Sequence, residues 1–157
     1  MKLRWDLNTR KLNIIFNYDK KGFRVRNSNR IKNIVEKIII EAGLKPEKIS
    51  IVFSSDRKIL KINKEFLNHN YFTDTITFDY SAGRIVNGEI YISIDRIKRN
   101  AKKYNVQIEE EVKRVIFHSI LHLCGYTDAS EVEKSIMRVM ENKYIKEFGE
   151  EWILNMI

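Results

Sequence analysis

The hydrophobic pattern of the chain changes its period near residue 95, and this change limits the folds that the chain can adopt. Before that point, short runs with the alternation of β-strands are interspersed with segments of helical spacing. After it, apolar residues recur three or four positions apart, which is typical of helices. The pattern therefore predicts an α+β domain with a small mixed β-sheet on which helices pack.

Individual elements follow from local signals. Strands are predicted at residues 13–18, 22–25, 49–53, 75–80 and 89–94, with Pro46 in the loop before the third. The last two strands are neighbours in sequence, so we expect them to pair as a hairpin. Helices are predicted at residues 31–42, after the capping residues 54–56, at 95–104, at 108–124, and in a last segment where Val132, Ile136, Met140 and Tyr144 recur at spacing four.

Composition indicates one globular domain, residues 1–157. Hydrophobic residues make up 43% of the chain and charged residues 32%, which is enough apolar surface for a core, and one proline leaves little material for a linker. The longest aliphatic run, residues 38–40, is far too short to span a bilayer, and no secretory signal precedes it. We therefore expect a cytoplasmic protein without a membrane partner.

The positive charge is concentrated at the beginning of the chain. The formal net charge is +8, and residues 1–32 contain ten basic and two acidic side chains, so the remainder is balanced. A surplus of this kind favours a polyanionic partner such as nucleic acid.

The strongest chemical signal is a pair of histidines in an apolar helix. His118 and His122 are four residues apart, which places both imidazoles on one helical face, where they can share a metal ion. Gly125 lets the chain fold back, so that Asp128 can supply a carboxylate. Three ligands leave one coordination position open, as in catalytic zinc sites. Nickel or another divalent ion would also suit this set, and histidine packing in the core is the alternative.

The only cysteine, Cys124, excludes an internal disulfide and a zinc site made of cysteines alone. It follows His122 by two positions and therefore points away from the ligand face. We expect it to be a small apolar residue of the core.

The segment 118–128, HSILHLCGYTD, resembles the H-G-x-L-H-L-x-G-Y-D-H motif of the YbeY-type endoribonucleases, metal-dependent enzymes of ribosomal RNA maturation. Asn63 and Phe66, followed by TDTITF at 73–78, resemble the family stretch N-x-x-[YF]-R…T-D-V-L-S-F. Residues 88–93, GEIYIS, resemble G-D-I-x-I-S. The three motifs agree in order and spacing from about residue 49 to residue 126. The resemblance implies a sheet of about four strands with the metal site in a cleft beside it.

The chain departs from the family pattern at two informative positions. Asp128 stands where the family has a third histidine, and aspartate is a competent zinc ligand. Leu67 stands where the family usually has an arginine, and His69 lies close enough in sequence to be a substitute. Asp74 and His69 are the candidate catalytic side chains, although the Thr73-Asp74 pair also suits a turn.

The resemblance and the histidine pattern together predict a zinc-dependent endoribonuclease that hydrolyses single-stranded ribosomal RNA or its precursor in ribosome biogenesis. His118, His122 and Asp128 are the predicted ligands of one Zn²⁺ ion, and the expected partners are the ribosome or its small-subunit proteins. Basic side chains near the beginning of the chain and on the helix after residue 94 are predicted to contact phosphates: Lys20, Lys21, Arg24, Arg26, Arg96, Arg99 and Lys103.

Two other functions compete with this hypothesis. A metallopeptidase also carries two histidines four apart, but its motif H-E-x-x-H has a glutamate base after the first histidine, where this chain has Ser119. Glu89 and Asp74 are the acids that a peptidase could recruit instead. A non-catalytic ribosome assembly factor with a structural metal is the second alternative, because Leu67 replaces the family arginine.

Overall fold

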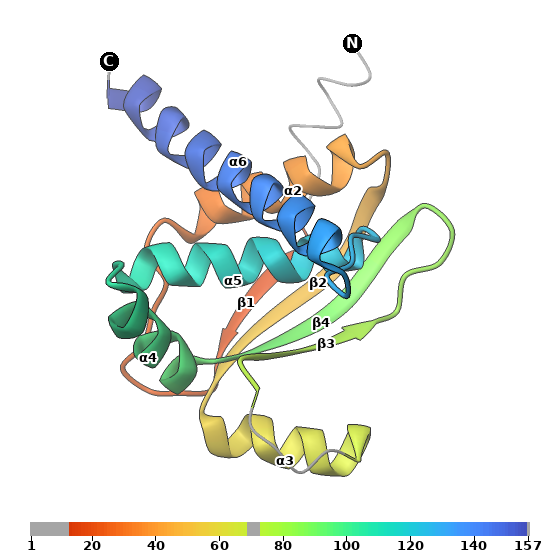
Figure 1. Cartoon of the computed structure of the whole chain (residues 1–157), viewed down its shortest axis with the longest axis vertical. Coiled ribbons are helices and arrows are strands. Elements are labelled where there is room, and N and C mark those ends of the chain that lie inside the picture. The colour runs from red at the N-terminus through yellow and green to blue at the C-terminus, as the bar shows by residue number, and fades with distance from the viewer. Residues whose placement is uncertain (1–12, 69–72, 157) are drawn as a thin grey trace.

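The computed structural model describes residues 13–68 and 73–156, with side chains described as far as residue 149. Figure 1 shows a four-stranded sheet with helices on both of its faces. The elements in chain order are β1 (Ile14–Tyr18), α2 (Ser28–Glu41), β2 (Lys45–Ser54), α3 (Asp56–Leu67), β3 (Thr75–Asp79), β4 (Ile85–Ser93), α4 (Ile94–Tyr104), α5 (Ile108–Leu123) and α6 (Glu131–Met156).

The sheet is mixed, with the strand order β1-β2-β4-β3. Strands β1, β2 and β4 are parallel, whereas β3 pairs with β4 in the antiparallel direction. The predicted α+β class and the predicted hairpin of the last two strands are therefore confirmed. Among the described helices, none is long and apolar enough to cross a membrane.

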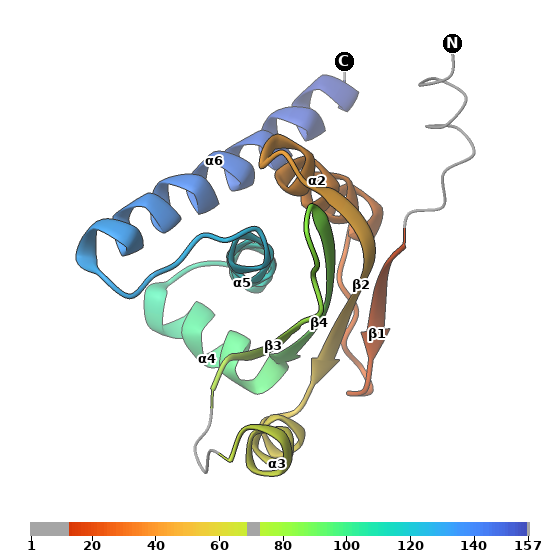
Figure 2. The same ribbon diagram turned by 90° about the vertical axis from the view of Figure 1, so that its right-hand side faces the viewer.

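The main core lies between the sheet and α5. Ile51 and Ile90 of the sheet and Ile116 and Ile120 of α5 are fully buried there. Figure 2 shows α2, α4 and α6 on the same side of the sheet as α5. On the opposite side, α3 covers one end of the sheet and buries Ile59 and Ile62 against Ile76 of β3.

Gly88 of β4 determines how closely α5 approaches the sheet. A Cβ atom at this position would lie 3.1 Å from both terminal methyl groups of Leu123 and 3.0 Å from the carbonyl oxygen of Phe78. Only a residue without a side chain leaves room for Leu123, the last residue of α5. The end of the helix that carries both histidines therefore rests directly on the strand.

An ion-pair cluster closes the carboxyl ends of the three parallel strands. Asp56 accepts hydrogen bonds from Ser93 Oγ at 2.5 Å and from Arg99 Nη2 at 2.5 Å. Asp95 pairs with Lys20 and accepts the backbone N–H of Asp56 at 2.8 Å. Burial alone would raise the pKa of Asp56, but Ser93 and Arg99 lower it overall, and the hydrogen bond from Lys20 lowers the pKa of Asp95.

Two local predictions were wrong. Residues 22–25 form no strand, because Phe23 packs its ring on Phe53 at 5.5 Å instead of pairing along β1. Pro46 lies inside β2 and not in a loop. The pairing with β4 shifts its register between Pro46 and Lys48, and such an irregularity accommodates a residue that has no N–H to donate. The predicted last helix is confirmed, although Val132 and Ile136 are exposed on it, because a strict spacing of four rotates about 40° per step around a helix of 3.6 residues per turn.

Replacing Gly88 by alanine tests the close approach of α5. The added methyl group must displace either Leu123 or the backbone of β3, so Gly88→Ala should lower the free energy of unfolding by about 1–3 kcal/mol. Urea denaturation measures this loss. Gly149→Ala on α6 is the matched control, since nothing lies within 4 Å of the position that its methyl group would take, and helix propensity there favours alanine by about 1 kcal/mol. Equal behaviour of the two variants would contradict the packing argument.

Replacing Asp95 by asparagine tests the ion-pair cluster. The folded-state pKa of Asp95 lies below its unfolded value, so the carboxylate stabilises the fold above about pH 4 and loses this effect as the pH falls through the folded pKa. Asp95→Asn should therefore lower the free energy of unfolding by about 1 kcal/mol at neutral pH. The difference from the parent should shrink in acid. Urea denaturation across a pH series measures this difference in the free energy of unfolding, with the exposed Glu47→Gln as control. A difference that does not change with pH would show that the charge of Asp95 is not its cause.

Candidate metal centre

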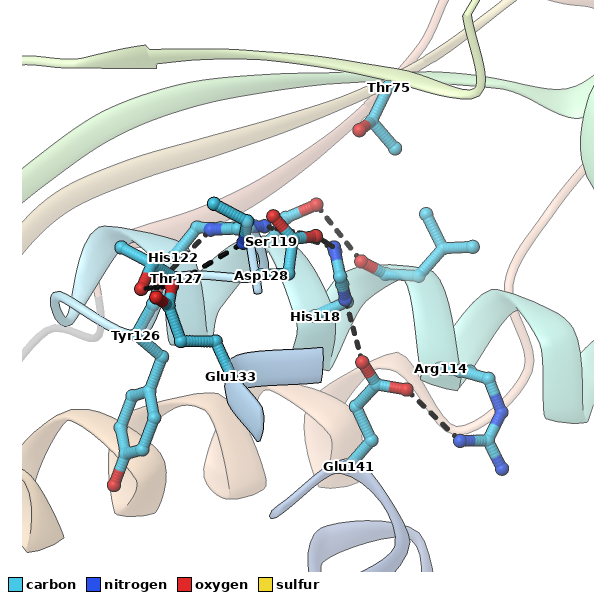
Figure 3. A network of polar contacts seen from close by, with 12 residues as sticks. Thr75, Arg114, His118, Ser119, His122, Tyr126, Thr127, Asp128, Glu133 and Glu141 are labelled. Atoms are coloured by element: carbon cyan, nitrogen blue, oxygen red, sulfur yellow. Dashed lines mark hydrogen bonds and ion pairs between the residues drawn. The ribbon is translucent and has the colours of Figure 1, made fainter. Parts of the chain in front are cut away.

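Three side chains from the end of α5 and the loop that follows it meet at one point. His118 Nε2 and His122 Nε2 are 3.0 Å apart, and Asp128 Oδ2 lies 3.4 Å from the first and 3.3 Å from the second. Figure 3 shows the two imidazoles and the carboxylate turned toward one another, with Thr75 of β3 on the sheet side. The structure thus brings together the three ligands that the sequence predicts.

The spacing of these donor atoms fits a metal ion. Ligands at about 2.0–2.2 Å from a tetrahedral zinc ion stand about 3.3–3.6 Å from one another. The two distances from Asp128 to the histidines lie within this range. The distance between the two Nε2 atoms would have to increase by only a few tenths of an ångström. The side chains are between 33% and 44% exposed, so one side of the site is open to solvent.

Each histidine is oriented by its other ring nitrogen. His122 Nδ1 lies 3.0 Å from the carbonyl oxygen of Tyr126. A carbonyl oxygen can only accept, so this nitrogen donates its proton and Nε2 keeps a free lone pair. His118 Nδ1 lies 2.6 Å from Glu141 Oε2, where a carboxylate is likewise the acceptor. Both rings are held with Nε2 toward the common point, as metal-binding histidines usually are.

The turn after α5 places Asp128. Gly125 has a φ of +99°, a conformation that glycine adopts without strain, and it follows the last turn of the helix. Beyond Asp128, the side chain of Ser130 accepts the N–H of Glu133 at 3.1 Å, and the carboxylate of Glu133 receives the hydroxyl of Thr127. Ser130 therefore caps the beginning of α6, and Glu133 ties that first turn back to Thr127 on the other side of Asp128.

Glu141 of α6 is the residue of the candidate site that sequence reasoning missed. It is only 7% exposed, and its second oxygen accepts a hydrogen bond from Arg114 Nη1 at 3.1 Å. The hydrogen bond to Glu141 raises the pKa of His118, although burial opposes it. The sequence did contain a signal for Glu141. Its spacing from Met137, Tyr144 and Phe148 places this acid on the same buried face of α6 as the three apolar residues.

Two further residues near the ligands have structural roles. Ser119, which follows His118, is 1% exposed and donates its hydroxyl proton to the carbonyl oxygen of Val115 at 2.9 Å. Burial raises the pKa of the Cys124 thiol to about 12, so this cysteine stays protonated and inert near neutral pH. Its expected role as a small apolar residue agrees with its packing on the core.

A polar hollow of about 530 Å³ adjoins the metal centre, because Arg114 and Glu141 line it. Asp74 lies on its wall and accepts a hydrogen bond from Asn100 Nδ2 at 3.0 Å. Glu111 is buried there, and burial raises the pKa of its carboxyl group. The hollow therefore offers both donors and acceptors on the side of His118 that faces Glu141. His69, the other candidate catalytic residue, lies outside the described residues.

The predicted RNA-binding residues fall into two groups. Lys20 pairs with Asp95, and both Arg96 and Arg99 pair with Asp56, so their charges are partly neutralised within the protein. The other group projects from the loop after β1 and from the end of α4: Lys21, Arg24, Arg26 and Lys103.

Comparison with known proteins places these features in one family. The family model described as "Endoribonuclease YbeY" matches residues 14–149. The chain is 41% identical to the Endoribonuclease YbeY of Flavobacterium psychrophilum over 86% of its own length and 96% of that protein. It is 46% identical to the Bacteroides fragilis protein of the same name over 60% of this chain and 68% of that one. The solution structure of TM1509 from Thermotoga maritima superimposes with a TM-score of 0.64 at 27% identity, covering 90% of this chain and 93% of that one.

The contact between Glu141 and His118 can be tested by metal affinity. Glu141→Gln keeps the shape of the side chain but removes the charge that holds the Nδ1 proton of His118, so zinc should bind about 10- to 100-fold more weakly. Competition with a chromophoric chelator measures the dissociation constant. Glu131→Gln, on the exposed first turn of the same helix, is the matched control and should bind zinc as the parent does. An unchanged affinity of Glu141→Gln would show that Glu141 serves packing alone.

Proposed function

Because the chain belongs to the YbeY endoribonuclease family, we propose that it is a metal-dependent hydrolase that cleaves internal phosphodiester bonds of single-stranded RNA. We propose zinc as the metal and His118, His122 and Asp128 as its ligands. The observation that carries the proposal is the convergence of their three donor atoms, all within 4.8 Å of one another. Ribosomal RNA or its precursor is the substrate that the resemblance of the motifs implies.

The chain's own residues would prepare this site before substrate arrives. Glu141 and the carbonyl oxygen of Tyr126 keep both Nε2 lone pairs aimed at the ion, and the capped loop presents Asp128. A zinc ion held in this way supplies Lewis acidity that polarises a phosphoryl oxygen and makes water a stronger nucleophile at neutral pH. The exposed side of the cluster gives a phosphodiester access to the ion.

A metallopeptidase is less well supported, because the glutamate base of the H-E-x-x-H motif is missing from α5. Ser119 occupies the position of that base, and its hydroxyl is buried against Val115. Glu89 is excluded by the strand geometry. Its neighbour Gly88 faces Leu123 of α5, so Glu89 projects from the opposite face of the sheet, where it accepts hydrogen bonds from Tyr80 and Tyr91.

Replacing His118 by alanine separates an enzyme from an assembly factor. His118→Ala should lower cleavage of a labelled single-stranded RNA by at least about 100-fold, because a metal ligand should matter no less than the residue that orients it. Its sedimentation with ribosomal particles should stay unchanged. Denaturing gels measure cleavage in added zinc.

Cys124→Ala is the control for that experiment, because Cys124 adjoins the ligands without belonging to the cluster. It should cleave as the parent does. Parent protein with full zinc occupancy but no nuclease activity above a contaminant control would contradict the enzymatic proposal and favour the assembly factor. Zinc-dependent hydrolysis of unfolded casein without RNA cleavage would favour the peptidase.

A further inference from the structure

A second cavity lies near the other end of α5 from the histidines. It has a volume of about 240 Å³ and is formed by the loop after β1, the first turns of α2 and α5, and Phe148 of α6. Figure 1 shows that loop passing the beginning of α5 on its way to α2. We call it the Lys113 pocket, after the half-buried lysine on its wall.

The floor of the Lys113 pocket is apolar. Phe23 and Val25 of the loop, Val112 of α5 and Phe148 of α6 supply it, and Ile108 stands at its edge with 37% of its surface exposed. The pocket is smaller than the sites of about 300–1,000 Å³ that enclose drug-sized ligands. It therefore suits a single group of about the size of a nucleobase.

The rim of the Lys113 pocket is cationic. Arg24, Arg26 and Lys113 line it, and Glu109 is the one acid among the described lining residues. Neither Arg26 nor Lys113 forms an ion pair with a carboxylate in the part of the chain that the structure describes. The Lys113 ammonium lies 4.2 Å from the centroid of the Phe148 ring, and burial lowers its pKa. An anion at this position would offset the cost of burying that charge.

An apolar floor beneath cations fits a ligand that combines an apolar ring with an anion. A nucleotide of single-stranded RNA has both, because base and phosphate belong to one unit, whereas an acidic side chain brings the charge without the ring. We propose that the Lys113 pocket binds one unstacked nucleotide of the RNA substrate, with the base on the apolar floor and the phosphate at Arg26 and Lys113. This inference rests on the proposed function.

The position of the pocket supports a role in holding the substrate. Residues 108–113 of α5 line the pocket, and His118 and His122 of the same helix belong to the metal centre, about 10–15 Å further along the helix axis. One rigid, buried helix therefore fixes the distance between the two sites. A strand held at the pocket would be positioned relative to the ion, although the pocket contributes no ligand to it.

Charge variants and a filling variant test the two halves of the pocket separately. Lys113→Met and Arg26→Gln should each weaken binding of a fluorescein-labelled single-stranded RNA by about 3- to 10-fold and reduce the salt slope by about 0.7, the effect of one lost phosphate contact on a single strand. Val25→Phe keeps the cations but fills the cavity, so it should weaken binding about 5-fold or more, through the lost base contact, without changing the salt slope. Fluorescence anisotropy at a series of salt concentrations measures both quantities.

Matched controls exclude general effects. Lys45→Met removes an exposed lysine at the beginning of β2, and Val139→Phe adds the same ring to exposed α6, so both should bind RNA nearly as the parent does. All variants should keep the zinc stoichiometry and melting temperature of the parent. If Val25→Phe lowers the melting temperature, Ile108→Phe at the exposed edge replaces it.

The outcomes distinguish this inference from the proposed function. If the parent cleaves RNA and the filling variant binds RNA as the parent does, the pocket proposal fails and the enzymatic one stands. If the parent neither binds nor cleaves RNA, the proposed function itself fails. If Val25→Phe keeps RNA binding but loses binding of a glutamate-rich peptide, the pocket belongs to a protein partner, which also overturns the proposal.

Discussion

The burial of α5 on several sides determines where the functional groups of this protein lie. Its residues contact the sheet, α2, α4 and α6, and most of its side chains are buried. A helix enclosed in this way cannot rotate or slide without disturbing the whole core. His118 and His122 therefore emerge in one fixed direction, toward the loop that carries Asp128. Gly88 sets the depth of the helix on the sheet, because Leu123 needs the space that a side chain there would occupy.

The cluster of His118, His122 and Asp128 could be predicted from the sequence because its arrangement is local. Two histidines at spacing four share a face on any α-helix, and Gly125 signals the reversal that brings Asp128 back. The order of the elements was equally accessible, since alternation and helical spacing are properties of short segments. Glu141 could not be found in this way, because its contact with His118 depends on how α6 packs on α5.

The electrostatic roles were the least predictable part of the site. A sequence gives the sign of a side chain but not its partner. Lys20 and Arg99 were predicted to contact phosphates, yet they pair with Asp95 and Asp56 at the ends of the parallel strands. Loop residues 22–25 were misread for a similar reason: an aromatic and β-branched segment can pack as a loop when a ring such as Phe53 lies beneath it. Both cases depend on contacts between segments that are distant along the chain.

The capped turn between α5 and α6 has a consequence for how the protein folds. Every group that holds or orients the proposed ion lies between Arg114 and Glu141, within two consecutive helices and the short connection between them. The ligand loop itself runs only from His122 to Asp128, whereas paired residues of β1 and β2, such as Ile14 and Ile49, are separated by the whole of α2. Closing the ligand loop therefore costs less chain entropy than pairing these strands. The donor set can therefore assemble on two consecutive helices before the long-range order of the sheet is complete. A cation captured at that stage would stabilise the pair during folding as well as in the finished protein.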